Sequence, residues 1–123
     1  METTTITSTP KISEETALEY TMMLTQDFKH PYGALRAMLG TKFFMRRENG
    51  IRFDLHGALH RVTLCDLEYD AGYDLFTLKF YRIKKWEGPQ LVKEFKMLYN
   101  DQLKEIFESY TGLCLSFPTI IYR

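Results

Sequence analysis

Apolar and polar positions alternate along much of the chain between Lys42 and Met97, and tight-turn signals interrupt the alternation. In the clearest run, Phe76, Leu78 and Phe80 alternate with Thr77, Lys79 and Tyr81. Successive side chains of a strand point to opposite faces, so a period of two predicts strands with one buried face. This part of the chain therefore predicts a meander of antiparallel hairpins.

Asn49-Gly50 separates two of these runs and is typical of a two-residue hairpin loop with a type I′ turn. With this loop, Arg46 faces Phe53 on the neighbouring strand. One face of the hairpin then carries Phe44, Ile51, Phe53 and Leu55, and the other carries Phe43, Met45, Arg47, Arg52 and Asp54.

Helical signals flank the strands. Ser13 is a good N-cap, acidic residues follow it, and Ala17, Thr21, Leu24 and Phe28 form one stripe. Gly40 and Gly112 are typical residues for the end of a helix. The expected elements are helices over about 14–27, 34–39 and 100–112, strands over about 41–47, 51–55, 61–69, 75–83 and 90–97, and a short strand or extended segment over 113–117.

This order predicts an α+β fold, in which an antiparallel sheet of about five strands is packed on one face by an N-terminal and a C-terminal helix. We expect residues 1–12 to form a flexible N-terminal arm and residues 13–123 to form a single α+β domain. The opposite sheet face is then solvated or meets a partner, and functional residues are expected there.

Charge is balanced overall but arranged in blocks. The chain has 16 basic and 16 acidic residues, so no net charge draws it to nucleic acid. Four acids lie in residues 66–74 and four bases in residues 79–86. The simplest interpretation is that neighbouring strands of opposite sign pair across the sheet.

Cys65 and Cys114 lie on apolar segments without a near cysteine neighbour, so both are expected to be buried and unpaired. The N-terminus lacks a signal-peptide pattern, and no apolar run has bilayer-spanning length. We expect a soluble, cytoplasmic protein without a membrane partner.

No catalytic, metal or nucleotide motif is present in the sequence. His56 and His60 have a spacing that suits metal ligands only on a helix, whereas Gly57 favours a loop here. Acids such as Asp66 and Glu68 lie in or beside a turn, where solvation explains them. We therefore expect neither an enzyme nor a cofactor.

The run Lys79-Phe80-Tyr81-Arg82-Ile83-Lys84-Lys85-Trp86 interleaves bases with aromatic rings. Single-stranded DNA or RNA requires this combination, because cations contact phosphates and bases stack on rings. The candidate binding residues are Arg47, Arg52, Lys79, Tyr81, Arg82, Lys85 and Trp86, with Arg46 as a further helper. Any sheet protein also places bases between aromatics, since Lys and Arg stems cover apolar surface.

More large rings are present than one small core is expected to hide, among them Tyr69, Tyr73, Tyr81, Trp86 and the apolar tail 117–122. Tyr, Trp and Arg are typical anchors of protein interfaces. We therefore expect a small non-enzymatic binding protein that acts through a protein partner or self-association as a homodimer. Single-stranded nucleic-acid binding is the alternative.

Three segments resemble a group of small uncharacterised proteins of bacteriophages and mobile elements. They are Leu39-Gly40-Thr41-Lys42-Phe43, Tyr73-Asp74-Leu75-Phe76 with the following Lys79-Phe80, and Tyr99-Asn100-Asp101-Gln102-Leu103 through Phe107 to Thr111-Gly112-Leu113. The resemblance implies a small α+β protein made in a bacterial cell, with a host or phage protein as its partner. It implies no settled biochemical activity.

Overall fold

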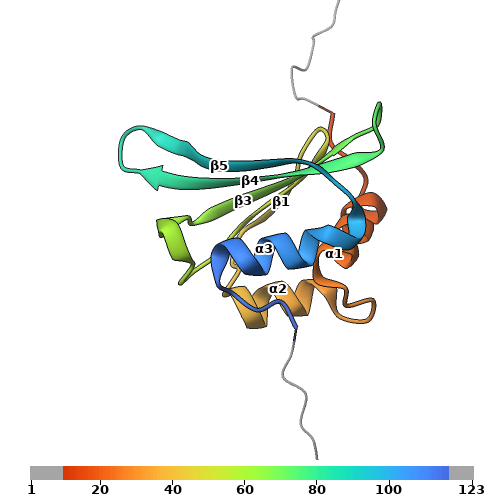
Figure 1. The fold of residues 1–123 in the computed structure, drawn as a ribbon, viewed down its shortest axis with the longest axis horizontal. Coiled ribbons are helices and arrows are strands. Elements are labelled where there is room, and N and C mark those ends of the chain that lie inside the picture. Colours follow the sequence, from red (N-terminus) through yellow and green to blue (C-terminus); the bar gives the residue numbers. More distant parts are fainter. Residues whose placement is uncertain (1–9, 117–123) are drawn as a thin grey trace, which may run out of the picture.

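The computed structural model describes residues 10–116, which form three α-helices and one five-stranded antiparallel sheet (Figure 1). The strands lie in chain order, β1-β2-β3-β4-β5, so each pairs with its sequence neighbour. The helices are α1 (Glu14–Thr25), α2 (Pro31–Leu39) and α3 (Leu103–Thr111), and the strands are β1 (Phe44–Arg46), β2 (Gly50–Asp54), β3 (Leu64–Asp70), β4 (Leu75–Lys84) and β5 (Gly88–Leu98). The predicted α+β fold is confirmed.

The helices lie on one side of the sheet (Figure 1). The side chains that alternate toward them, such as Phe53 of β2 and Phe80 of β4, are fully buried. Phe107 of α3 contacts both rings, with centroid distances of 6.2 Å and 5.7 Å. Apolar burial is the main driving force of folding, so this layer between sheet and helices holds the molecule together.

Local signals set the ends of the helices. The Ser13 hydroxyl accepts a hydrogen bond from the Thr16 backbone N–H at 3.1 Å and thus caps α1. Gly40 and Gly112 follow α2 and α3 with φ of 70° and 74°, which glycine adopts without strain. The predicted extension of the α1 stripe to Phe28 is wrong, because α1 ends at Thr25 and the Phe28 ring is exposed.

The register of the first hairpin differs from the prediction. Arg46 faces Ile51 rather than Phe53, and no residue of the turn has the positive φ that a type I′ turn requires. Gly50 instead belongs to β2 and lies so close to β3 that an added Cβ would be 1.9 Å from the Leu67 carbonyl oxygen. The register moves by two residues, so each side chain keeps its predicted face.

Several finer expectations are corrected. Ile12 is not part of a free arm, because its N–H donates to the Arg47 carbonyl at 2.9 Å and its side chain packs partly on the core. Cys65 is buried as predicted, whereas Cys114 is exposed. Of the short strand or extended segment predicted over 113–117, the strand does not form in residues 113–116. Residues 1–9 of the predicted arm and residues 117–123 of the apolar tail lie outside the described residues.

Short 3-10 helices, η1 (Leu59–Arg61) and η2 (Asn100–Gln102), precede β3 and α3. Strand β5 forms a sheet edge and carries two bulges. It has one extra residue opposite the β4 segment from Phe76 to Leu78 and another opposite the step from Phe80 to Tyr81. Within residues 10–116, every helix is too short or too polar to cross a membrane.

Candidate binding surface on the outer sheet face

The sheet face opposite the helices carries a polar centre. Register and alternation place Met45, Arg52, Asp66, Lys79 and Glu94 in one row across the five strands. Asp66 lies in the middle of this row and is only 1% exposed. A carboxylate buried to this degree requires a charged partner or hydrogen bonds.

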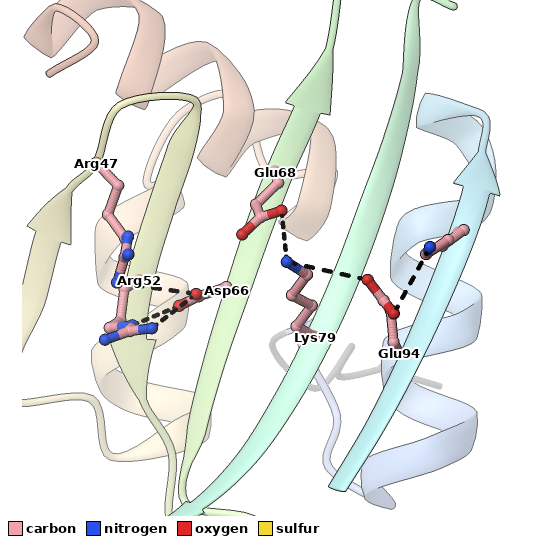
Figure 2. A network of polar contacts seen from close by, with 7 residues as sticks. Arg47, Arg52, Asp66, Glu68, Lys79 and Glu94 are labelled. Atoms are coloured by element: carbon pink, nitrogen blue, oxygen red, sulfur yellow. Dashed lines mark hydrogen bonds and ion pairs between the residues drawn. The ribbon is translucent and has the colours of Figure 1, made fainter. Parts of the chain in front are cut away.

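Arg52 is that partner. Its Nε donates to Oδ1 of Asp66 at 2.6 Å and its terminal nitrogen donates to Oδ2 at 2.9 Å, which is a bidentate ion pair (Figure 2). These hydrogen bonds from the guanidinium to Asp66 raise the pKa of Arg52 above its ordinary value. Arg47 approaches the same carboxylate more loosely, at 3.9 Å. Asp66 therefore pairs with two of the predicted binding arginines, Arg52 closely and Arg47 loosely.

Lys79 is also paired. Its Nζ lies 3.0 Å from Glu68 on β3 and 3.9 Å from Glu94 on β5 (Figure 2). Burial alone would lower the pKa of Lys79, but the hydrogen bond with Glu68 raises it above the ordinary value. The interpretation that acidic and basic strands pair across the sheet is confirmed at both positions.

An apolar zone adjoins this polar centre at the end of the sheet where β4 and β5 continue. Tyr81 on β4 faces Leu64 on β3 and Leu91 on β5. The Arg52 guanidinium lies over the Tyr81 ring at 5.2 Å, a cation–π contact that links the two zones. Two residues further along β4, Ile83 faces Pro89.

The β4–β5 hairpin projects beyond the helices (Figure 1). Lys84 faces Gly88, so the loop consists of Lys85, Trp86 and Glu87. The Trp86 side chain is 92% exposed, and Ile83 and Leu91 behind it are 55% and 52% exposed. We define the hairpin surface as Tyr81, Ile83, Pro89 and Leu91 on the outer face together with Trp86 at the tip.

Trp86 also has an unusual backbone. Its φ is 74°, in the left-handed region, where the Cβ of a bulky residue crowds the backbone. Within residues 10–116, its one cation–π neighbour is Lys85, whose Nζ lies 5.4 Å from the ring centroid. A large apolar side chain is thus held in solvent on a strained backbone, and neither feature helps the core.

The structure separates the predicted binding residues. Arg47, Arg52, Lys79 and Tyr81 share the outer face, and Lys85 and Trp86 lie at the hairpin tip. Arg82 points to the helix side, where it donates to the His60 carbonyl at 2.8 Å. Arg46 also alternates to the helix side and donates to the Ile12 carbonyl. The predicted surface is therefore not one continuous basic platform.

Ile83, Pro89 and Leu91 were not among the predicted binding residues. Ile83 shares a strand face with Tyr81 by simple alternation, which the sequence already contains. The position of Leu91 opposite Tyr81 depends on the three-residue loop, because the pairing is regular from Lys84/Gly88 to Tyr81/Leu91. Only pairing of the strands brings these apolar residues together with Trp86.

His56 and His60 have separate roles. His56 forms an ion-pair or hydrogen-bond contact with Asp54 at 2.9 Å, and His60 stacks on Tyr110 with ring centroids 4.3 Å apart. In the part of the chain that the structure describes, no three His, Cys, Asp or Glu side chains gather as they would around a metal ion.

No protein-family model matches the chain, and no curated protein or solved structure matches it at a significant level.

Proposed function

We propose that this protein is a small non-enzymatic binding protein, and that the hairpin surface is where it binds a protein partner. The observation that carries the proposal is Trp86, a 92% exposed indole at the tip of a projecting hairpin, with the exposed apolar residues Ile83 and Leu91 behind it. Tryptophan is enriched among the residues that dominate binding energy at protein interfaces.

Backbone strain supports the same assignment. A non-glycine residue in the left-handed region costs about 1–2 kcal/mol relative to the right-handed one. Trp86 carries this strain without burying its ring in the described core. Strain of this kind is often found at functional sites.

The surroundings of the tip indicate the chemistry of the partner. Lys84 and Lys85 directly precede Trp86 and are exposed, and no ion pair within residues 10–116 involves either of them. A complementary partner has an apolar pocket for the indole and carboxylates at the rim. The resemblance to phage and mobile-element proteins makes a bacterial host or phage protein the first class to test.

The edge of the sheet is a weaker candidate for the interface. Strand β5 is long enough to pair with another strand, but it carries two bulges and Pro89. Bulges and prolines are features by which natural edge strands avoid pairing with other chains. A homodimer, if formed, is therefore expected to use the hairpin surface rather than the β5 edge.

Site-specific photo-crosslinking tests the proposal. A photoreactive phenylalanine analogue at position 86 is compared with the same analogue at position 28, where the native Phe28 ring is 67% exposed on the helix side. We expect one protein to crosslink from position 86 and not from position 28. A product that forms equally from both positions, or no product from position 86, would contradict the proposal.

The purified partner then gives an affinity measurement. Truncation of an interface hot spot weakens binding by about 2 kcal/mol or more, which is roughly 30-fold. We expect Trp86→Ala to reach this loss and Phe28→Ala to leave the affinity unchanged in isothermal titration calorimetry. If the captured protein is a second copy of this chain, sedimentation analysis must give a dimer that Trp86→Ala dissociates.

Single-stranded nucleic acid is less favoured than a protein partner. Arg52 and Lys79 are paired with Asp66 and Glu68, so neither provides a free cation for phosphate. Titration of labelled single-stranded DNA and RNA at about 50 and 200 mM salt separates the two functions, because several phosphate contacts would make the affinity fall by orders of magnitude over this range. Tight, salt-sensitive binding would overturn our preference.

A further inference from the structure

A groove of about 720 Å³ lies on the other side of the molecule, between α1, α2 and β1. Its volume is in the range of small-molecule sites, roughly 300–1,000 Å³. None of its lining residues belongs to the hairpin surface. Its function is therefore independent of the protein-binding role proposed above.

The groove has an apolar base. Leu18 of α1, Leu35 of α2 and the rings of Tyr32 and Phe44 line it. The two rings meet edge to face, with centroids 5.0 Å apart and an interplanar angle of 79°. This contact fixes both side chains, so the base is preformed for an apolar ligand group.

Charges of opposite sign come from different sides of the groove. Glu14 and Glu15 lie in the first turn of α1, whereas Arg36, Lys42 and Arg46 come from α2, the α2–β1 connection and β1. The ion pairs within residues 10–116 include none between these five side chains. The acids and bases thus line one groove without neutralising each other.

Tyr32 lines the groove together with both charged groups. Burial raises the pKa of the Tyr32 phenol, the hydrogen bond with the Thr21 side chain lowers it, and the charges of Glu14 and Arg46 shift it in opposite directions. Both charges therefore act on a ring in the base of the groove. A ligand seated on this ring has an acidic side and a basic side within reach.

We propose that this groove binds a short apolar peptide with free amino and carboxyl termini. The ammonium group faces Glu14 and Glu15, the carboxylate faces Arg36 and Lys42, and the apolar side chains lie on Tyr32 and Phe44. A peptide fits better than a single amino acid, because a groove of about 720 Å³ is larger than one residue fills, and each added residue also separates the two terminal charges. Charge complementarity and the apolar base both select this class of ligand.

The test uses the dipeptide leucyl-phenylalanine and three analogues that each lack one recognised group. N-acetylation removes the ammonium charge, C-terminal amidation removes the carboxylate, and glycyl-glycine lacks the apolar side chains. Binding is measured by isothermal titration calorimetry, and its place by backbone amide shifts in the NMR spectrum. We expect each analogue to bind about tenfold more weakly or worse, since a hydrogen bond to a charged group contributes about 1.5–3 kcal/mol and burial of a large apolar side chain contributes a similar amount.

Variants of the protein supply the second half of the test. Glu15→Gln and Arg36→Gln change exposed side chains, so folding is retained while one charge of the groove is lost. Both are expected to weaken the dipeptide, whereas Lys85→Gln and Glu87→Gln in the hairpin loop leave its affinity unchanged. The proposal is overturned if the dipeptide does not bind at millimolar concentration, if the acetylated or amidated analogue binds equally well, or if the shifts fall outside α1, α2, β1 and the α2–β1 connection.

Discussion

At the scale of single residues, the ion pair between Arg52 and the buried Asp66 gives a direct test of what stabilises the sheet. Removing one partner of a buried ion pair costs about 3–5 kcal/mol, because the other charge stays buried alone. Asp66 is 1% exposed, but the Arg52 side chain retains 18% exposure, and Arg47 lies close enough to compensate in part. We therefore expect Arg52→Ala to lower the free energy of unfolding by roughly 2–4 kcal/mol.

Lys79→Ala is the matched control, because the Lys79–Glu68 pair lies on the same face but is more exposed. Pairs of this kind contribute about 1 kcal/mol or less. Denaturant unfolding followed by circular dichroism measures both variants. Equal losses would mean that Asp66 is not held mainly by Arg52.

Asp54 predicts how stability depends on pH. Burial alone would raise its pKa, but the backbone N–H of Phe43, the His56 ring and the N–H of Lys42 donate to the carboxylate and lower it below 3.8. The ionised form is the one that the fold stabilises, so this contribution is complete above the ordinary value of 3.8 and is lost as the pH falls through the lower folded value.

We expect Asp54→Asn to reduce stability at neutral pH and to make the loss of stability in acid shallower than in the native protein. Urea unfolding at about pH 7 and about pH 3 checks both effects. The exposed Asp101→Asn serves as the control. A variant that loses stability in acid as steeply as the native protein does would exclude Asp54 as a contributor.

Substitution of Trp86 by glycine is expected to raise the free energy of unfolding and to lower the affinity for the partner. Glycine adopts a φ of 74° without steric strain, so we expect Trp86→Gly to raise the free energy of unfolding by up to about 1 kcal/mol. Trp86→Ala keeps the Cβ and should bring no such gain. Both variants are expected to lose partner binding. A clear loss of stability in Trp86→Gly, measured by denaturant unfolding, would mean that the indole supports the fold.

At the scale of the elements, substitutions of Gly50 in β2 and Gly33 in α2 test how closely the strands pack and how well the helix forms. An alanine Cβ at Gly50 would lie 1.9 Å from the Leu67 carbonyl oxygen, so β2 and β3 must separate. At Gly33, inside α2, the nearest side-chain atom is 3.5 Å away, which is an ordinary contact.

We expect Gly50→Ala to destabilise the protein by roughly 2 kcal/mol or more through overpacking. Gly33→Ala should stabilise it by about 0.5–1 kcal/mol, because alanine is the better helix former. Thermal unfolding of the two variants should shift in opposite directions. A shift in the same direction would show that close strand approach is not the role of Gly50.

Gly50 also shows which features of the first hairpin could be predicted from the sequence and which could not. Alternation alone placed Phe44, Phe53 and Arg52 on their correct faces, since a two-residue change of register leaves every face the same. The predicted two-residue loop Asn49-Gly50 is wrong, because Gly50 is needed in β2, where it packs against β3, and so is not free to form the type I′ turn. That contact between strands is not encoded locally.

At the scale of the whole molecule, the candidate site was only partly predictable. Trp86 and Tyr81 were identified from residue type and position, and the structure places both on the hairpin. Arg82 could not be assigned from composition, because its face depends on the pairing of β4 and on the contact with His60. The groove between α1, α2 and β1 joins segments about 30 residues apart, so only the folded chain reveals it.

The position of the sole tryptophan has a practical consequence. An indole that is 92% exposed in the native state meets nearly the same solvent after unfolding. We expect its fluorescence emission maximum to stay almost constant across a denaturant transition that circular dichroism records in full. Occlusion of the hairpin tip should instead shift the emission to the blue and protect it from acrylamide quenching, so the intrinsic fluorescence of this protein reports association and hardly reports folding.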